Sequence, residues 1–303
     1  IQHRIYMTTF LRKQVDERGL ADGTGMGRIY RIVPDGYSRP KMKFNLATEP
    51  SAQLVSRLRA ANSWWRDTAQ RLLVERRDPA SVAPLRDLVR AGPPLAKLHA
   101  LWTLHGIEQL DRDTVLVALK DADERVAAAA IRLAEKWLRM PSDTQVYQAV
   151  MAVNAAASPT LTLQLALSLG ESPAPAAVKD LAAIAVRAGN QPYVADAIVS
   201  GLAGRELEFI QLIDVANASE QAAAALTLAT SSLLKTGDAA RITQVLALLE
   251  PTAKVAPWVR GAVLNGVERF LPKTPEGKPV AGNIAVEPRP LLLLSVQGST
   301  PEG

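Results

Sequence analysis

Histidine and cysteine are the residue types that most often carry metal or covalent chemistry, and this sequence holds few of them. It contains three His, at positions 3, 99 and 105, and no Cys in 303 residues. A chain without thiols has no thiolate nucleophile, no thiolate zinc site and no covalent haem attachment within these residues. His99 and His105 lack the i, i+4 spacing of a helical zinc pair. We therefore expect no metal site and no catalytic residue in this chain.

The adjacent aromatic residues Trp64 and Trp65, followed by Arg66, are a candidate binding group. Large aromatic side chains and Arg are enriched at the energetic centres of protein interfaces. On a helix, neighbouring side chains point about 100° apart, so only one of the two Trp can fully face the core. We favour packing in the core and against a neighbouring domain, because large aromatic side chains most often serve packing.

The charges are unevenly distributed along the chain. The net charge is +5, and residues 1–48 carry all of it, with 9 Lys and Arg against 4 Asp and Glu. The remaining residues hold 26 basic and 26 acidic side chains. A nucleic-acid-binding surface needs a basic stripe with interleaved aromatic residues, which this pattern lacks. No apolar run approaches the roughly 20 residues of a membrane-spanning helix. We expect neither nucleic-acid binding nor a membrane span.

Residues 1–47 differ in pattern from the rest of the chain. Gly23, Gly25 and Gly27 break any helix there, and the segment that follows, 28–33, is rich in β-forming residues. Residues 34–36 read Pro-Asp-Gly, a turn sequence, so we expect one strand before them. A single strand is not stable alone. We therefore expect its partner strands to belong to a longer protein, of which this chain is a segment.

From residue 48 onward, apolar residues follow helical spacing, and a unit of two helices recurs roughly every 30 residues. The first helices of these units are expected at residues 51–60, 82–90, 114–119, 144–154, 176–188, 207–216 and 239–249. The second helices are expected at residues 64–73, 95–107, 124–134, 159–169, 193–202, 221–234 and 257–271. Small residues recur in the second helices and suit close packing between units: Ala69, Ala100, Ala128, Ala197 and Ala224. The predicted fold class is mainly α, a solenoid of about six or seven helix pairs with a short N-terminal β segment.

Four segments carry a resemblance to a known family. They read IQHRIYMTTFLRKQ at 1–14, GMGRIYRIV at 25–33, WWRDTAQRLL at 64–73 and LHALWTL at 98–104. They resemble the multidomain "membrane-bound dehydrogenase" proteins of planctomycetes and related bacteria. In that family a β-propeller, similar to sorbosone or glucose dehydrogenases, is followed by HEAT repeats and a cytochrome c domain. The resemblance is specific over residues 1–138 and architectural beyond them.

The resemblance implies a domain organisation. Residues 1–47 would be the C-terminal remnant of the propeller, residues 48–271 a HEAT-like α-solenoid, and residues 272–303 a Pro-rich linker with the start of a further segment. The catalytic propeller face and the Cys-x-x-Cys-His haem motif of the family would lie outside this chain. Oxidation of a sugar or alcohol, with haem c, or haem c and a quinone, as cofactors, would belong to the parent protein in the periplasm or cell envelope. No cofactor is expected in this segment.

His3, Arg4 and Tyr6 are a second weak candidate group, since they lie in the propeller-like segment. They could reach toward a ligand in the central channel of a propeller, where such folds bind ligands. The alternative is a hydrogen-bond network that closes the last blade. We favour the alternative, because a lone His without a second catalytic partner nearby carries little information.

The function expected from these patterns is that of a scaffold without catalysis. Within a haem-coupled sugar or alcohol dehydrogenase, it would hold the propeller against an electron-accepting cytochrome domain. The alternative is a free-standing HEAT-repeat adaptor that binds another protein. A helical-repeat enzyme acting on DNA bases would need a basic face, and the neutral charge balance after residue 48 argues against it.

Overall fold

The structure is a computed structural model, and it describes residues 4–20, 27, 29–38, 45–140, 144–155, 158–213, 219–271 and 289–292. Within these ranges it contains the fifteen α-helices α1 to α15, a short helical stretch at residues 289–292, five short 3-10 helices and no strand. The protein is therefore mainly helical, as the sequence predicts. The chain divides into two compact units, Ile1–Asn45 and Leu46–Gly303.

The first unit holds a helix where the sequence analysis expects a β segment. A short 3-10 helix, η1 (Arg4–Tyr6), precedes α1 (Thr9–Glu17), and the hydroxyl of Thr8 caps α1 by accepting a hydrogen bond from the backbone N–H of Leu11 at 3.3 Å. No residue of α1 is buried. Polar, well-capped helices form locally, whereas a strand needs a partner for its backbone groups.

The strand expected at residues 28–33 is absent from the described part of that segment. Residue 28 lies outside the described residues, and residues 29–34 have no regular secondary structure. The side chains of Ile29 and Ile32 are fully exposed. No described residue supplies the second strand that such a β-forming sequence needs, so its backbone does not pair.

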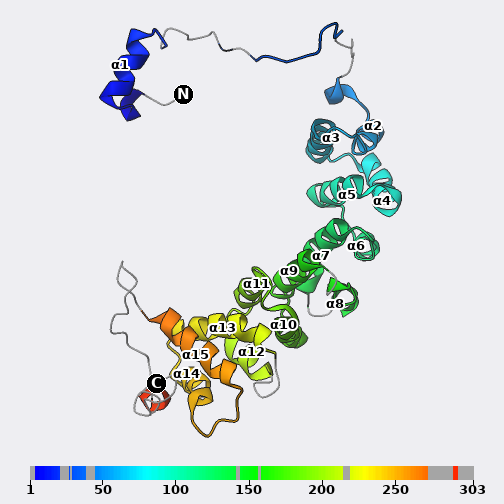
Figure 1. Ribbon diagram of the computed structural model, residues 1–303. Coiled ribbons are helices and arrows are strands. Elements are labelled where there is room, and N and C mark those ends of the chain that lie inside the picture. The colour runs from blue at the N-terminus through cyan, green and yellow to red at the C-terminus, as the bar shows by residue number, and fades with distance from the viewer. Residues whose placement is uncertain are drawn as a thin grey trace. The chain divides into compact units, whose positions relative to one another are not determined.

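The second unit contains fourteen of the helices, which match the predicted ranges closely (Figure 1). The helices predicted as the first of each pair are α2 (Ser51–Arg57), α4 (Val82–Ala91), α6 (Arg112–Ala118), α8 (Thr144–Met151), α10 (Pro175–Ala188), α12 (Glu206–Leu212) and α14 (Ala239–Leu246). The second helices are α3 (Ser63–Arg76), α5 (Pro94–Gly106), α7 (Glu124–Leu138), α9 (Pro159–Leu169), α11 (Val194–Ser200), α13 (Ala223–Lys235) and α15 (Pro257–Phe270). All fourteen predicted helices are confirmed.

Turn residues start these helices as the sequence predicts. The carboxylates of Asp111 and Asp123 accept hydrogen bonds from the backbone N–H groups at the starts of α6 and α7, at 2.7 and 3.0 Å. The hydroxyl of Ser158 does the same for α9 at 3.3 Å. Each such cap stabilises its helix by about 1 kcal/mol. Helices α5, α9, α10 and α15 have Pro in their first turn, where its missing N–H costs no hydrogen bond.

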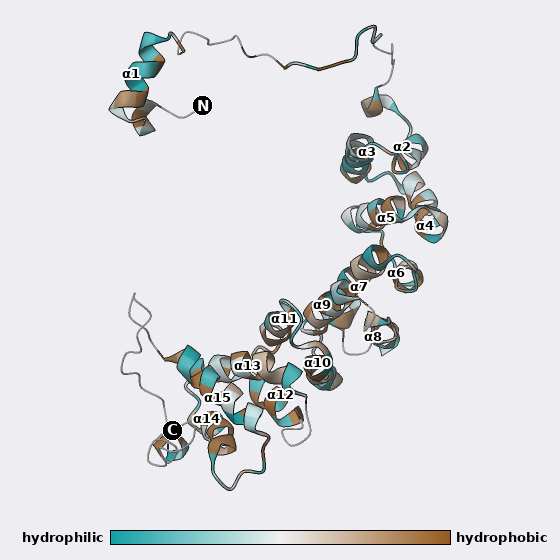
Figure 2. Cartoon of the chain, viewed as in Figure 1, coloured by the Kyte–Doolittle hydropathy of each residue, from teal (hydrophilic) through white to brown (hydrophobic). Residues whose placement is uncertain are grey.

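The helices of the second unit contact each other in a regular order. Each odd-numbered helix from α3 to α13 packs on the next odd-numbered helix. The even-numbered helices form a second series, in which the next even-numbered helix is contacted by α2, α4, α6, α10 and α12. Figure 2 shows that the apolar residues lie mostly on the faces turned toward neighbouring helices. Leu, Val and Ala make up most of the buried side chains, and Phe209 is the largest fully buried one. The core is therefore continuous from pair to pair.

Side-chain hydrogen bonds link helices that are separated along the chain. Eight of these bonds join residues that are 32 to 35 positions apart: Arg66–His99, Glu124–Ser158, Glu135–Ser168, Arg139–Glu171, Tyr147–Asp180, Glu206–Arg241, Gln211–Gln244 and Thr227–Ala262. Two of the acidic residues, Glu135 and Glu206, are almost completely buried and make ion pairs with Arg132 and Arg241. Other bonds between helices span shorter or longer separations, from 24 positions for Lys97–Asp121 to 37 for Arg241–Gly204.

Of the segment 272–303, predicted as a linker and the start of a further segment, only residues 289–292 are described; they are helical, and Leu291 packs against the core of the second unit. Among the described helices, none combines the length and the apolar character needed to cross a bilayer.

Candidate functional site

The structure describes little of the first predicted group. His3 lies outside the described residues, and only the backbone of Arg4 is described, within η1. Tyr6 ends η1 with an exposed side chain. The proposed roles of these three residues, at a propeller channel or in blade closure, therefore stay predictions.

The second predicted group lies at the start of α3 and divides as expected between surface and core. The ring of Trp64 is 53% exposed and meets the ring of Trp65 edge to face, with 5.2 Å between the ring centroids. Trp65 packs against the core, and the guanidinium carbon of Arg57 lies 4.9 Å from its ring centroid. One Trp faces the interior and the other faces solvent, which the 100° step between helical neighbours predicts.

Arg66 is bound within the fold. Its guanidinium donates hydrogen bonds to the carbonyl oxygens of Ala60 and Ala61, each at 2.7 Å, and to Nε2 of His99 at 3.2 Å. Nε2 of His99 therefore accepts, which leaves the proton on Nδ1 to be donated to the side-chain oxygen of Gln70 at 2.6 Å. Burial, and then the charge of Arg66, lower the pKa of His99 below its usual value. This network joins α3 to α5 and keeps His99 neutral.

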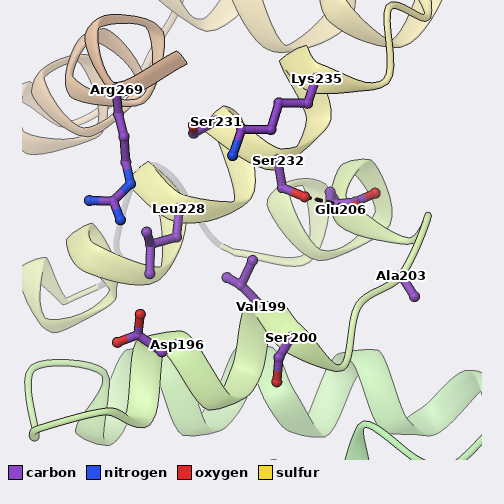
Figure 3. Close-up of a pocket in the computed structure, with 10 residues that line it drawn as sticks. All are labelled: Asp196, Val199, Ser200, Ala203, Glu206, Leu228, Ser231, Ser232, Lys235 and Arg269. Carbon is purple, nitrogen blue, oxygen red and sulfur yellow. Dashed lines mark hydrogen bonds between the residues drawn. The ribbon is translucent and has the colours of Figure 1, made fainter. Parts of the chain in front are cut away.

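A groove that the sequence analysis missed follows the odd-numbered helices. One pocket of about 380 Å³ lies between α11, α13 and α15, with Glu206 of α12 at its side (Figure 3). A second pocket, of about 550 Å³, lies beside it over α7, α9 and the end of α11. The two pockets share Ser200 and Ala203, so they adjoin, and together they are called the groove.

The charge of Glu206 in the first pocket is balanced inside the protein. The Glu206 carboxylate is 4% exposed and accepts hydrogen bonds from the backbone N–H of Gly204 at 3.2 Å and the hydroxyl of Ser232 at 3.3 Å. Arg241 forms an ion pair with the same carboxylate at 3.3 Å. This acidic group is held in place by three donors and has a structural role.

Three other charges in the first pocket are not balanced. Asp196, Lys235 and Arg269 line the pocket, and none of them forms an ion pair with another described residue. Figure 3 shows the side chains of Lys235 and Arg269 extending into the pocket from α13 and α15, with Asp196 on the opposite side. The hydroxyl oxygen of Ser231 is buried beneath them and has no hydrogen-bond partner in the described structure. The pocket thus offers two cations and one anion to a ligand.

Two glycines form the floor of the second pocket. A Cβ added to Gly170 would lie 2.5 Å from the Cα of Gly201, and one added to Gly201 would lie 2.4 Å from the Cα of Gly170. The C-terminal ends of α9 and α11 therefore touch backbone to backbone, which a larger residue would prevent. Leu167, 43% exposed, supplies an apolar surface beside this floor.

Among the described residues that line the first pocket there are three Ser but no His. Over the described residues, no cluster of three or more His, Asp or Glu side chains is placed to hold a metal ion. The groove instead presents fixed charges and hydroxyl groups along neighbouring helices, which suits recognition of a charged ligand.

Comparisons with known proteins add no family to this description. No protein-family model matches the chain, and a search of the curated proteins returns no match. The fold and the site define a mainly helical protein with an open groove of mixed charge. Its function is inferred from that groove.

Proposed function

We propose that residues 46–271 form a HEAT-like α-solenoid of seven helix pairs that binds a segment of a partner protein. Hydrogen bonds between residues 32 to 35 positions apart support the repeat, because equivalent positions of stacked units recur at the repeat length. The packing of α3, α5 and α7 on one another, in chain order, supports the stack. Such stacks present one long surface built from successive units.

The groove over α7 to α15 is the observation that carries the proposed function. Its unbalanced charges come from α11, α13 and α15, three second helices in sequence order. An interface gains specificity when the partner protein supplies complementary charges. Asp196, Lys235 and Arg269 form no ion pair with another described residue, so no ion pair has to break before they bind a partner. A partner segment lying along the groove would meet several units at once.

The placement of this scaffold in a haem-coupled dehydrogenase rests on the resemblance alone and stays a prediction. The partner would then be the protein's own propeller or cytochrome domain. A blade-repeat pattern upstream and a Cys-x-x-Cys-His motif downstream in the coding sequence would support this. Flanking sequence without either pattern would favour the free-standing adaptor.

Binding through the groove can be tested with two matched substitutions. A displayed library of random peptides is selected on the purified chain, and the enriched peptides are measured again on Leu167→Arg and Val117→Arg. The two residues are 43% and 44% exposed, but Leu167 lies in the groove on α9 and Val117 lies on α6.

We expect Leu167→Arg to abolish peptide binding and Val117→Arg to leave it unchanged. Circular dichroism checks that both variants keep their helix content. Equal binding to the two variants, or failure to enrich any peptide, would refute the proposed function.

A further inference from the structure

We propose that the pocket between α11, α13 and α15 binds a carboxylate of an extended partner segment, the side chain of an Asp or Glu. This inference rests on the proposed function and names the chemistry that the groove recognises. Lys235 and Arg269 supply the positive charge. The two residues come from two helices, α13 and α15, that pack on each other.

The charges of the pocket select an anion of low charge. Because Glu206 is neutralised by Arg241, the unbalanced groups are Lys235, Arg269 and Asp196, which leave one net positive charge. A carboxylate matches that charge. A phosphate carries nearly two negative charges at neutral pH, and the second would be repelled by Asp196.

The continuation of the groove points to an extended chain as the carrier of that carboxylate. The pocket joins the second pocket through Ser200 and Ala203. Leu167 lies on α9, two helices away from α13, because α9 packs on α11 and α11 packs on α13. Packed helices lie about 8–10 Å apart, and an extended chain advances about 3.3 Å per residue, so two helix spacings equal about five or six residues. An acidic residue in the first pocket therefore places a residue five or six positions away beside Leu167 and the Gly170–Gly201 floor. The predicted motif is an acidic residue and an apolar residue five or six positions apart.

Charge reversal tests the motif. The random peptide library is selected in parallel on the wild-type chain, on the double variant Lys235→Glu/Arg269→Glu, and on the control double variant Lys179→Glu/Arg187→Glu. The control makes the same change in net charge with two exposed cations of α10, outside the groove. Circular dichroism checks the fold of each variant.

We expect wild type and control to select the same acidic motif, and the groove variant to select Lys or Arg at the acidic position. The wild-type peptide should bind the groove variant at least roughly tenfold more weakly, since charge-assisted hydrogen bonds are lost. An unchanged motif on the groove variant would overturn the inference.

Other outcomes separate the inference from the proposed function. Peptides that depend on Leu167 but carry no acidic residue would overturn the carboxylate site and leave the proposed function standing. Failure to enrich any peptide would overturn both. Inorganic phosphate that binds the wild-type chain more tightly than the acidic peptide, and is lost in the groove variant, would show a free-anion site and overturn the inference.

Discussion

Replacing either glycine of the contact between α9 and α11 should destabilise the protein. A Cβ in Gly201→Ala would lie 2.4 Å from the Cα of Gly170, whereas carbon atoms in contact lie about 3.5–4.0 Å apart. Both sides of this contact are backbone, so no side chain can rotate away and the helix ends must separate by about 1 Å. Overpacking of this kind costs about 1–3 kcal/mol. Both glycines have negative φ, −60° and −88°, so Ala also gains up to about 1 kcal/mol of helix propensity.

The expected net loss for Gly201→Ala is about 1–2 kcal/mol, or about 2–8 °C in Tm for a domain of this size. Gly261→Ala is the matched control, because no atom lies within 4 Å of the added Cβ in the middle of α15. The control should gain up to about 1 kcal/mol. Thermal unfolding followed by circular dichroism at 222 nm measures both variants. Equal stability of Gly201→Ala and Gly261→Ala would refute the close backbone contact.

Two further predictions concern buried polar groups. The pKa of His99 is lowered in the folded protein, so below about pH 6.5 the unfolded state binds a proton that the folded state does not, and stability falls as the pH falls. Between pH 7.5 and 5.5 this loss in the free energy of unfolding is at most about 1.4 kcal/mol. Urea unfolding at the two pH values should show a smaller loss for His99→Gln than for the wild-type chain. An identical pH dependence in that variant would contradict the network. Glu206→Gln should lose about 1–3 kcal/mol, because it weakens the buried contact with Arg241. The control Glu208→Gln changes a half-exposed ion pair, so its free energy of unfolding should stay within about 0.5 kcal/mol of the wild-type value in the same assay. Equal losses in the two variants would argue against a buried role of Glu206.

The helices of the second unit were predictable because local rules decide them. Apolar spacing and a capping carboxylate, Asp123, locate α7, and packing against α5 and α9 agrees with that local preference. The small residues were predicted with less success. Ala69, Ala100 and Ala197 are buried, but Ala128 is only half-buried and Ala224 is exposed. The 3-10 turn η5 (Glu220–Ala222) precedes α13, and the neighbouring Ala225 takes the buried position there.

The first unit and the groove needed information that local sequence does not carry. A β-forming stretch around Ile29 becomes a strand only if another strand pairs with it, and the described residues provide none. The groove joins Asp196, Lys235 and Arg269, which are ordinary surface residues in the sequence and come together only through helix packing. The glycines that follow α9 and α11, 31 positions apart, were the one available signal of close approach.

The short sequence separation of the hydrogen bonds between helices has a consequence for how the protein is made. The helices of the second unit find their bonding partners within about the next 40 residues, as in Glu124–Ser158 and Arg139–Glu171. Proteins with such local contacts fold quickly, since little loop closure precedes each contact. During synthesis, a pair can dock as soon as the following pair has left the ribosome, so the second unit can assemble from its N-terminal end while translation continues. The apolar face of each new helix is then exposed to solvent only until about one more helix pair has been synthesised.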